Sequence, residues 1–178
     1  MSEHSHDHHH HSHKREIRIS LEEFLELFPV TRLPVTLSEE AAHEFSKEND
    51  VMPGLVIEQY MVPLEGEIDE WTEFVPCFRF PDTKDFHAIV YWKAGLMQYY
   101  FVLVTLTLQG QVIDKRVLAG TYVAGEVVTQ SVATIDPDWI ITVVTGQNRS
   151  GKDAFYDAST SKASGMEVMP NGTIIDEE

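Results

Sequence analysis

The sequence has one cysteine, few basic residues and no long apolar run, and each shortage excludes a class of protein. Cys77 alone cannot form a disulfide within the chain, so a disulfide-stabilised fold is excluded and a reducing compartment is favoured. Its apolar and aromatic neighbours predict a buried, inert thiol. The amino terminus lacks the apolar core of a secretory signal, and no apolar run is long enough to span a bilayer. We therefore expect a cytoplasmic protein.

Positive charge is scarce. The chain has 13 Lys plus Arg against 29 Asp plus Glu, which gives a formal net charge of −16. Such an acidic protein repels phosphate backbones and anionic membrane surfaces, and its basic residues do not cluster. The composition therefore predicts neither nucleic acid nor membrane as a partner. A protein partner is expected to be basic.

Apolar residues are missing from the first fifteen positions after Met1, where histidine dominates. We predict that residues 1–15 form a disordered His-rich arm and that residues 16–178 form a single domain. Neutral imidazole suits zinc, nickel and copper, so the arm is a candidate metal-binding segment. The alternative, which we favour, is that the arm is a polar tail without a metal role. In that case we expect the protein to have no cofactor. The candidate metal ligands are His4, His6, His8, His9, His10, His11 and His13.

Two short helices are predicted near the start of the domain. Ser20 followed by Glu23 forms a capping-box pattern, and an apolar stripe at helical spacing runs from Leu21 to Phe28 before Pro29 ends it. Ser38 is the expected N-cap of a second helix over "SEEAAHEFSKEND". Residues 52–71 are ambiguous, and we expect loops around a short segment near 55–61. Five carboxylates are expected to lie in a solvated acidic loop, namely Glu65, Glu67, Asp69, Glu70 and Glu73.

From about residue 72 the apolar pattern changes to period two, which is typical of strands. Turn signals such as Gln109-Gly110 and Asn171-Gly172 separate the runs, and connections this short require antiparallel neighbours. We predict an α+β, mainly β fold: a curled antiparallel meander with the two helices on one face or closing one end. The expected strands lie near 72–79, 86–92, 96–108, 112–119, 126–135, 139–144, 154–159, 166–169 and 173–175.

The stretch "TGQNRSGKD" nearly matches the G-x-x-x-x-G-K-[ST] loop that holds nucleotide phosphates. The last position is Asp153, which would place a carboxylate against phosphate. Too little chain follows Lys152 to build the required parallel sheet. We interpret the stretch as a polar hairpin loop between two strands.

Histidine outside the arm is limited to His43 and His87. "HEFSK" carries Lys47 where a zinc protease helix would have its second histidine, so His43 and Glu44 are interpreted as an exposed helical pair. His87 is interpreted as a structural histidine on a strand. The alternative is an enzyme with a site around His87 in a cavity of the sheet.

The chain resembles a group of uncharacterised small bacterial proteins rich in β-strand. The resemblance rests on a Phe-Pro and Leu-Pro opening, a later G-x-V/I-I-D hairpin and the closing "PNGTI". The group has no assigned activity, so the resemblance implies a type of fold and no chemistry. The matching residues are Phe28, Pro29, Leu33, Pro34, Gly110, Val112, Ile113 and Asp114.

The sequence contains no evident set of acid, base and nucleophile, and we predict a non-catalytic binding or interaction protein rather than an enzyme. The alternatives are a metal-handling protein that uses the arm, and an enzyme around His87. An inhibitor or immunity-type protein that captures a basic partner is a narrower version of the binding hypothesis. Candidate surface anchors are the aromatic residues Trp92, Tyr99, Tyr100, Tyr122 and Trp139, most of which we expect in the core.

Overall fold

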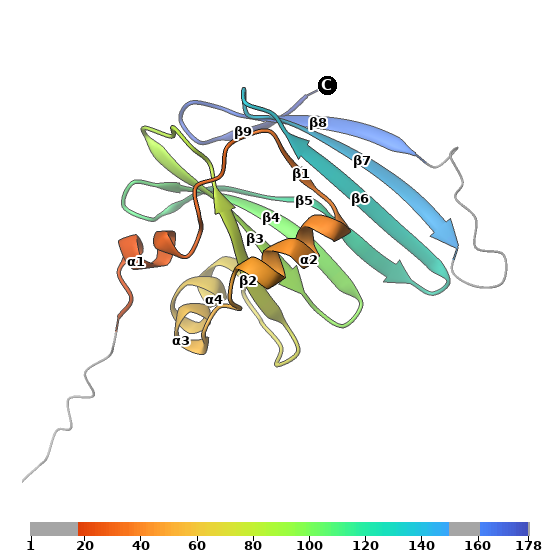
Figure 1. The fold of residues 1–178 in the computed structure, drawn as a ribbon, viewed down its shortest axis with the longest axis horizontal. Helices are drawn as coiled ribbons and strands as arrows, with labels where there is room; N and C mark the ends of the chain where they lie inside the picture. The colour runs from red at the N-terminus through yellow and green to blue at the C-terminus, as the bar shows by residue number, and fades with distance from the viewer. Residues whose placement is uncertain (1–17, 150–160, 178) are drawn as a thin grey trace, which may run out of the picture.

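A computed structural model describes residues 18–149 and 161–177 (Figure 1). The helical elements come first and nearly all the strands follow. The helices are α1 (Leu21–Glu26), α2 (Glu39–Glu48), α3 (Gly54–Val56), the π-helical turn η1 (Ile57–Met61) and α4 (Val62–Glu65). The strands are β1 (Val35–Leu37), β2 (Glu73–Arg79), β3 (Phe86–Ala94), β4 (Gln98–Thr107), β5 (Val112–Ala124), β6 (Val127–Ile135), β7 (Ile140–Arg149), β8 (Lys162–Val168) and β9 (Ile174–Glu177).

The strands form one open antiparallel sheet in the order β2-β3-β4-β5-β6-β7-β8-β9, so each strand pairs with its neighbour in the sequence. The predicted mainly β antiparallel fold with two short helices near its amino end is confirmed. The one crossover is β1, which pairs antiparallel with β6. No helix among the described residues is long and apolar enough to cross a membrane.

The sheet bends at β6, because the two halves of this strand pair with different strands on the same edge. Residues 127–131 of β6 pair with β5, whereas residues 133–135 pair with β1. Strands β6, β7 and β8 therefore diverge from β2, β3 and β4, as Figure 1 shows. The space between the two groups of strands holds one apolar core, which includes Phe78, Phe101, Leu103, Ile135 and Ile141.

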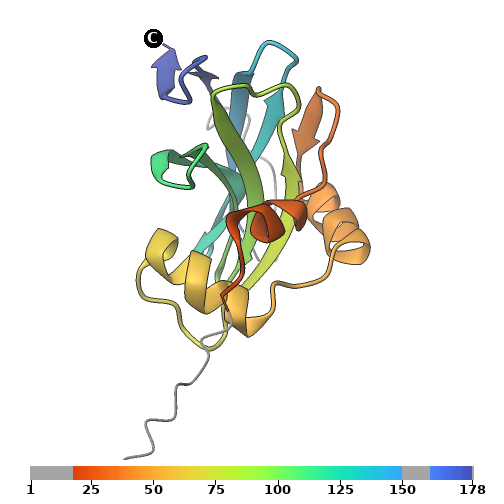
Figure 2. The same ribbon diagram turned by 90° about the vertical axis from the view of Figure 1, so that its left-hand side faces the viewer.

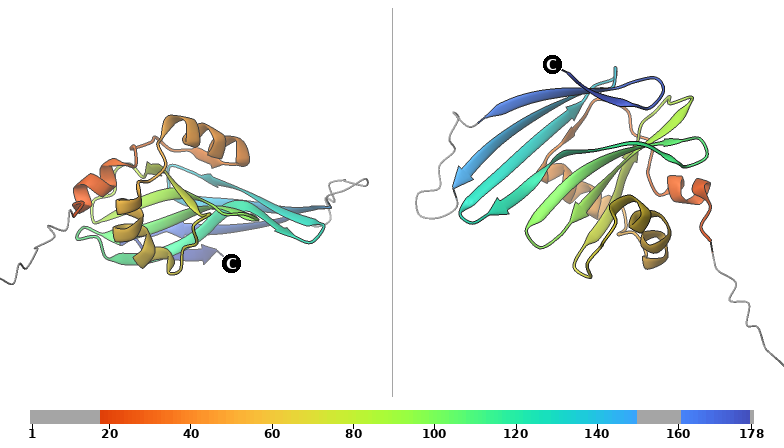
Figure 3. Two further views of the ribbon diagram at one scale, coloured as in Figure 1. Left: turned by 90° about the horizontal axis from the view of Figure 1, so that it is seen from below. Right: turned by 180° about the vertical axis from the view of Figure 1, so that it is seen from behind.

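Helices cover the two faces of strands β2–β4. Figure 2 shows α2 on one side of the sheet and the α3–α4 segment on the other, and Figure 3 gives two further views. Ala42 of α2 belongs to the core between the strands. A second core lies under α1 and the 54–65 segment on the opposite face, and includes Phe24, Phe28, Met61, Phe74 and Tyr91.

Local sequence explains where α1 and α2 begin. The Ser20 hydroxyl accepts the Glu23 N–H at 3.1 Å and begins α1, whose Phe24 is buried. The Ser38 hydroxyl accepts the Ala41 N–H at 3.3 Å and begins α2. Both predicted N-caps are confirmed. Because α1 has only six residues, its position depends on packing, and Phe24 stacks on Tyr60 of η1 at 4.1 Å between ring centroids.

Glu65 contradicts the prediction of a solvated acidic loop. Its side chain is only 6% exposed, and it accepts hydrogen bonds from the Tyr91 hydroxyl and, at 2.9 Å, from the Lys93 ammonium. The Lys115 ammonium lies 3.1 Å away and also donates to the Leu64 carbonyl. Burial by itself would raise the pKa of Glu65, but the hydrogen bonds from Tyr91, Lys93 and Lys115 outweigh it, so the pKa is lowered. The sequence did not reveal this cluster because its members come from α4, β3 and β5.

The end of the chain docks on β4 and β5 through side chains. Asp114 accepts the Ile174 N–H at 2.9 Å, and Arg116 donates to the Ile174 carbonyl at 3.1 Å. Thr105, which is fully buried, donates to the Gly172 carbonyl at 2.6 Å. These bonds join β9 to β5 where no backbone ladder is present between the two strands.

The predicted break at "GQNRSGK" is partly wrong, because β7 continues through Arg149. Gly146 pairs with Gln130 in an antiparallel ladder, so it cannot form the turn from a parallel strand to a helix that a phosphate loop needs. Lys152 and the predicted strand at 154–159 lie outside the described residues.

Candidate functional site

The predicted metal ligands of the arm lie outside the described residues. Within the described part, no group of three or more His, Cys, Asp and Glu side chains could hold a metal ion. The metal hypothesis therefore rests on the sequence of the arm alone.

Cys77 and His87 are placed as the sequence predicts. Cys77 is 1% exposed on β2, and burial raises the pKa of its thiol, so the thiol is an unreactive part of the core. His87 lies half-buried on β3 and lines a shallow cavity of about 260 Å³ with Arg79 and Asp82. Burial, followed by the charge of Arg79, lowers the pKa of His87. Within residues 18–149 and 161–177 no hydrogen bond joins His87 to an acidic or nucleophilic side chain, which such an enzyme site would need.

A concave site lies between α2 and the sheet. Two cavities of about 250 and 310 Å³ adjoin there, and both are lined by Glu39, Trp92 and Thr121. We call the combined surface the α2 groove. Its remaining lining residues are Ser38, Glu40, Ala42, His43, Ser46, Tyr99, Phe101, Gly120, Gln130, Ser131 and Val132.

An aromatic cluster forms the floor of the α2 groove. Trp92 of β3 pairs in register with Phe101 of β4, and their ring centroids lie 4.6 Å apart. Tyr99 stacks on the other side of the same cluster, 5.9 Å from Trp92 with an interplanar angle of 7°. Phe45 of α2 packs on Phe101 at 6.3 Å and on Phe78 at 5.9 Å. These contacts fix the helix over the sheet and leave the Trp92–Tyr99 pair facing the groove.

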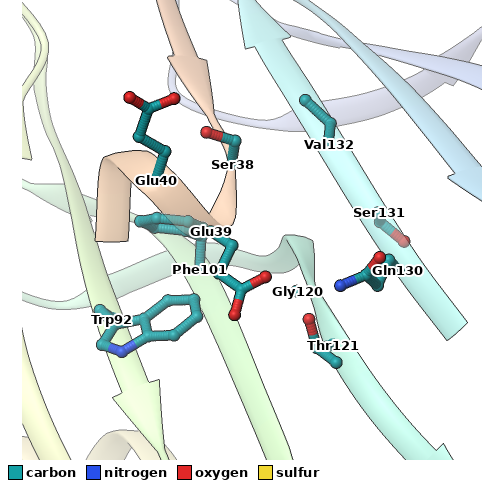
Figure 4. Close-up of a pocket in the computed structure, with 10 residues that line it drawn as sticks. All are labelled: Ser38, Glu39, Glu40, Trp92, Phe101, Gly120, Thr121, Gln130, Ser131 and Val132. Atoms are coloured by element: carbon teal, nitrogen blue, oxygen red, sulfur yellow. The ribbon is translucent and has the colours of Figure 1, made fainter. Parts of the chain in front are cut away.

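Polar groups converge above this floor. Figure 4 shows the carboxylate of Glu39, the hydroxyl of Thr121 and the amide of Gln130 directed into the same space, while the Glu40 carboxylate points away. Among the described residues, no cation or hydrogen-bond donor lies within bonding distance of the Glu39 carboxylate. The described lining contains two carboxylates and His43 but no lysine or arginine.

The aromatic floor continues onto an exposed apolar tip at the β3–β4 turn, which we define as Leu96, Met97 and Tyr99. Leu96 is 69% exposed and Met97 55% exposed, and Tyr99 is also exposed. Tyr122 is exposed as well, but it pairs with Gln98 and therefore faces the opposite side of the sheet from Tyr99 and its partner Thr121. Because large exposed apolar patches often coincide with interaction sites, the tip is a candidate for one.

No family model, curated protein or solved structure matches the chain. The α2 groove therefore has to be interpreted from its own chemistry.

Sequence reasoning found part of this site. Trp92 and Tyr99, which line the groove, are among the predicted surface anchors, whereas the predicted anchor Tyr122 lies on the opposite face of the sheet. Tyr99 and Tyr122 are exposed and Trp92 is half-buried against the core, as are Tyr100 and Trp139. Glu39 was missed as a site residue, because a carboxylate in the first turn of a helix is sufficiently explained by the helix dipole. No local signal relates Glu39 to Trp92, which lies on a distant strand.

Proposed function

We propose that this protein is a non-catalytic binding protein and that the α2 groove holds its partner. The observation that carries the proposal is the Glu39 carboxylate, which has no counter-charge among the described residues and is directed into a concave site floored by the stacked Trp92–Tyr99 pair. Apolar concavities with a few convergent polar groups are the usual form of a binding site. The open shape allows a ligand to enter without movement of the sheet.

Binding rather than catalysis is favoured by the spacing of reactive groups. His43 is exposed on the rim of the groove, which it lines together with Ser46 of α2 and the Trp92 ring. No hydrogen bond within the described residues connects it to a hydroxyl or a carboxylate that it could activate. A positioned acid or base with a hydrogen-bonded partner is a common element of hydrolytic and transfer sites.

A fragment screen by NMR tests the location of the site. We expect amide shifts of the full chain to concentrate at Glu39, Trp92 and Thr121, since these residues line both cavities. Thr121→Tyr should fill the groove and abolish the shifts. Thr142→Tyr is the matched control, because Thr142 is exposed on β7 away from the groove. Shifts that cluster elsewhere, or that survive Thr121→Tyr, would contradict the proposal.

The second candidate function is metal handling, and seven histidines within the first thirteen residues favour it. Several interchangeable imidazoles on one arm would bind several metal ions with pH-dependent affinity. We expect the full chain to retain several equivalents of nickel in equilibrium dialysis and a chain beginning at Glu16 to retain none. Equal retention by the two chains would exclude the arm as the metal site.

A further inference from the structure

We propose that the occupant of the α2 groove is a basic segment of a partner protein. A lysine or arginine side chain of this segment lies against the Trp92–Tyr99 pair and forms an ion pair with Glu39. This inference rests on the proposed function and names the class of partner that the groove takes.

The aromatic floor favours a cation. The negative face of an indole ring attracts an ammonium or guanidinium group within about 6 Å, and tryptophan does so best among the aromatic residues. Trp92 is half-buried, which holds its ring in place, and Tyr99 stacks beside it with an exposed outer surface. A cation on this surface would lie within reach of the Glu39 carboxylate, which Figure 4 shows above Trp92.

The charges of the groove select the same ligand. The amino end of α2 carries a helix dipole of about half a positive charge, which by itself would favour an anion. Glu39 and Glu40 in the first turn supply two full negative charges, so the local field attracts cations. The net charge of −16 adds a long-range attraction that speeds the encounter with a basic partner.

The apolar tip indicates a protein segment rather than a small free cation. A small ammonium ion would occupy the space over Trp92 and leave Leu96 and Met97 exposed to water. A segment that carries apolar residues next to its basic residue would cover the tip and Trp92 together, because Tyr99 belongs to both surfaces. Central aromatic anchors with a surrounding polar rim are typical of protein interfaces.

The loop that precedes β2 extends the acidic surface toward the tip. Glu73 pairs in register with Ala94, which places the start of β2 beside the β3–β4 turn. Glu70 and Trp71 are exposed in this loop, and Trp71 is 61% exposed. A basic and apolar segment that covers the tip would thus meet the Glu73 carboxylate beside the β3–β4 turn.

Three twelve-residue peptides and one small ion test the inference. The first peptide alternates lysine with leucine, and the other two replace every lysine with glutamine or with glutamate. Butylammonium is the small cation. We expect the lysine peptide to bind the full chain at least about tenfold more tightly than the glutamine peptide, with amide shifts at Glu39, Trp92 and Thr121. The glutamate peptide and butylammonium should each bind more weakly than the lysine peptide.

Two charge-neutralising variants identify the ion pair. Glu39→Gln should lower the affinity of the protein for the lysine peptide by about fivefold, whereas Glu44→Gln should change this affinity by less than about twofold. Glu44 is the matched control because it lies on the exposed surface of the same helix and lines neither cavity. Equal effects of the two variants would show that only net charge matters and would overturn the ion pair with Glu39.

The other outcomes separate this inference from the proposed function. If the glutamine or glutamate peptide binds the groove as tightly as the lysine peptide, the basic partner is wrong and the groove remains a binding site. If butylammonium binds as tightly as the lysine peptide, the site takes a small cation and the protein segment is wrong. If neither peptides nor fragments shift the groove residues, the proposed function itself fails.

Discussion

Replacing Gly120 with alanine is expected to lower the free energy of unfolding by about 3 kcal/mol, because an added methyl group has no space there. A Cβ atom at this position would lie 1.9 Å from the Tyr99 carbonyl oxygen and 2.9 Å from the Tyr100 ring. The first of these is backbone, which cannot rotate away, so β5 would have to separate from β4. Thermal and denaturant unfolding of the two proteins measure the effect.

Gly54→Ala is the control for this change. Gly54 begins α3, and a Cβ atom there would meet no heavy atom within 4 Å. We expect its unfolding curve to match the parent within about 0.5 kcal/mol. If Gly120→Ala were equally harmless, the close approach of β5 to β4 beside the α2 groove would be wrong.

Replacing Glu65 with alanine is expected to cost about 2–4 kcal/mol at pH 7, the second large effect. The change leaves the Tyr91 hydroxyl, on a side chain that is 0% exposed, without its partner. It also leaves Lys93 and Lys115 without their shared counter-charge. Both ammonium groups are about a third exposed, so water recovers part of that loss. Urea unfolding of the variant measures the difference.

The contribution of Glu65 to the free energy of unfolding should also depend on pH. Because its pKa is lowered in the fold, this contribution should decrease in acid. A carboxyl group whose pKa is lower in the folded state than in the unfolded state stabilises the fold. This stabilisation is fully present when the pH is above the group's ordinary pKa of 4.5. That contribution is lost as the pH falls through the folded-state pKa. We expect the stability difference between the parent and Glu65→Gln to be constant near neutrality and to shrink in acid. A difference that grew on acidification would contradict the ion pairs.

Much of the fold was accessible from the sequence because its determinants are local. The Ser20 and Ser38 caps act within one helical turn, and the period-two runs from residue 72 onward correspond to strands. Short connections then require an antiparallel meander. The structure differs where distant segments decide. The acidic stretch around Glu65 gives no local sign that one of its carboxylates is buried, because the cations that compensate Glu65 come from β3 and β5.

Only part of the candidate site could be predicted from the sequence, again because distant segments form the rest of it. Exposed aromatic residues on strands stand out in the sequence, so Trp92 and Tyr99 could be proposed as anchors. Their meeting with Glu39 depends on the path of β1, which carries α2 across the sheet. No pattern within the first fifty residues identifies β6 as the partner of β1, since a three-residue strand carries too little periodicity to specify one.

The pairing of β1 with β6 sets an order of events during synthesis of the chain. Val35 pairs with Ile135, one hundred positions later, so β1 and α2 leave the ribosome long before the strand that holds them exists. Contacts between such distant residues form slowly, because a long loop must close first. The part of the α2 groove that β6 lines can therefore form only after β6 has been synthesised. A nascent chain that stops before β6 has every aromatic residue of the floor but lacks Gln130, Ser131 and Val132, and we expect it to be unable to form the proposed binding site.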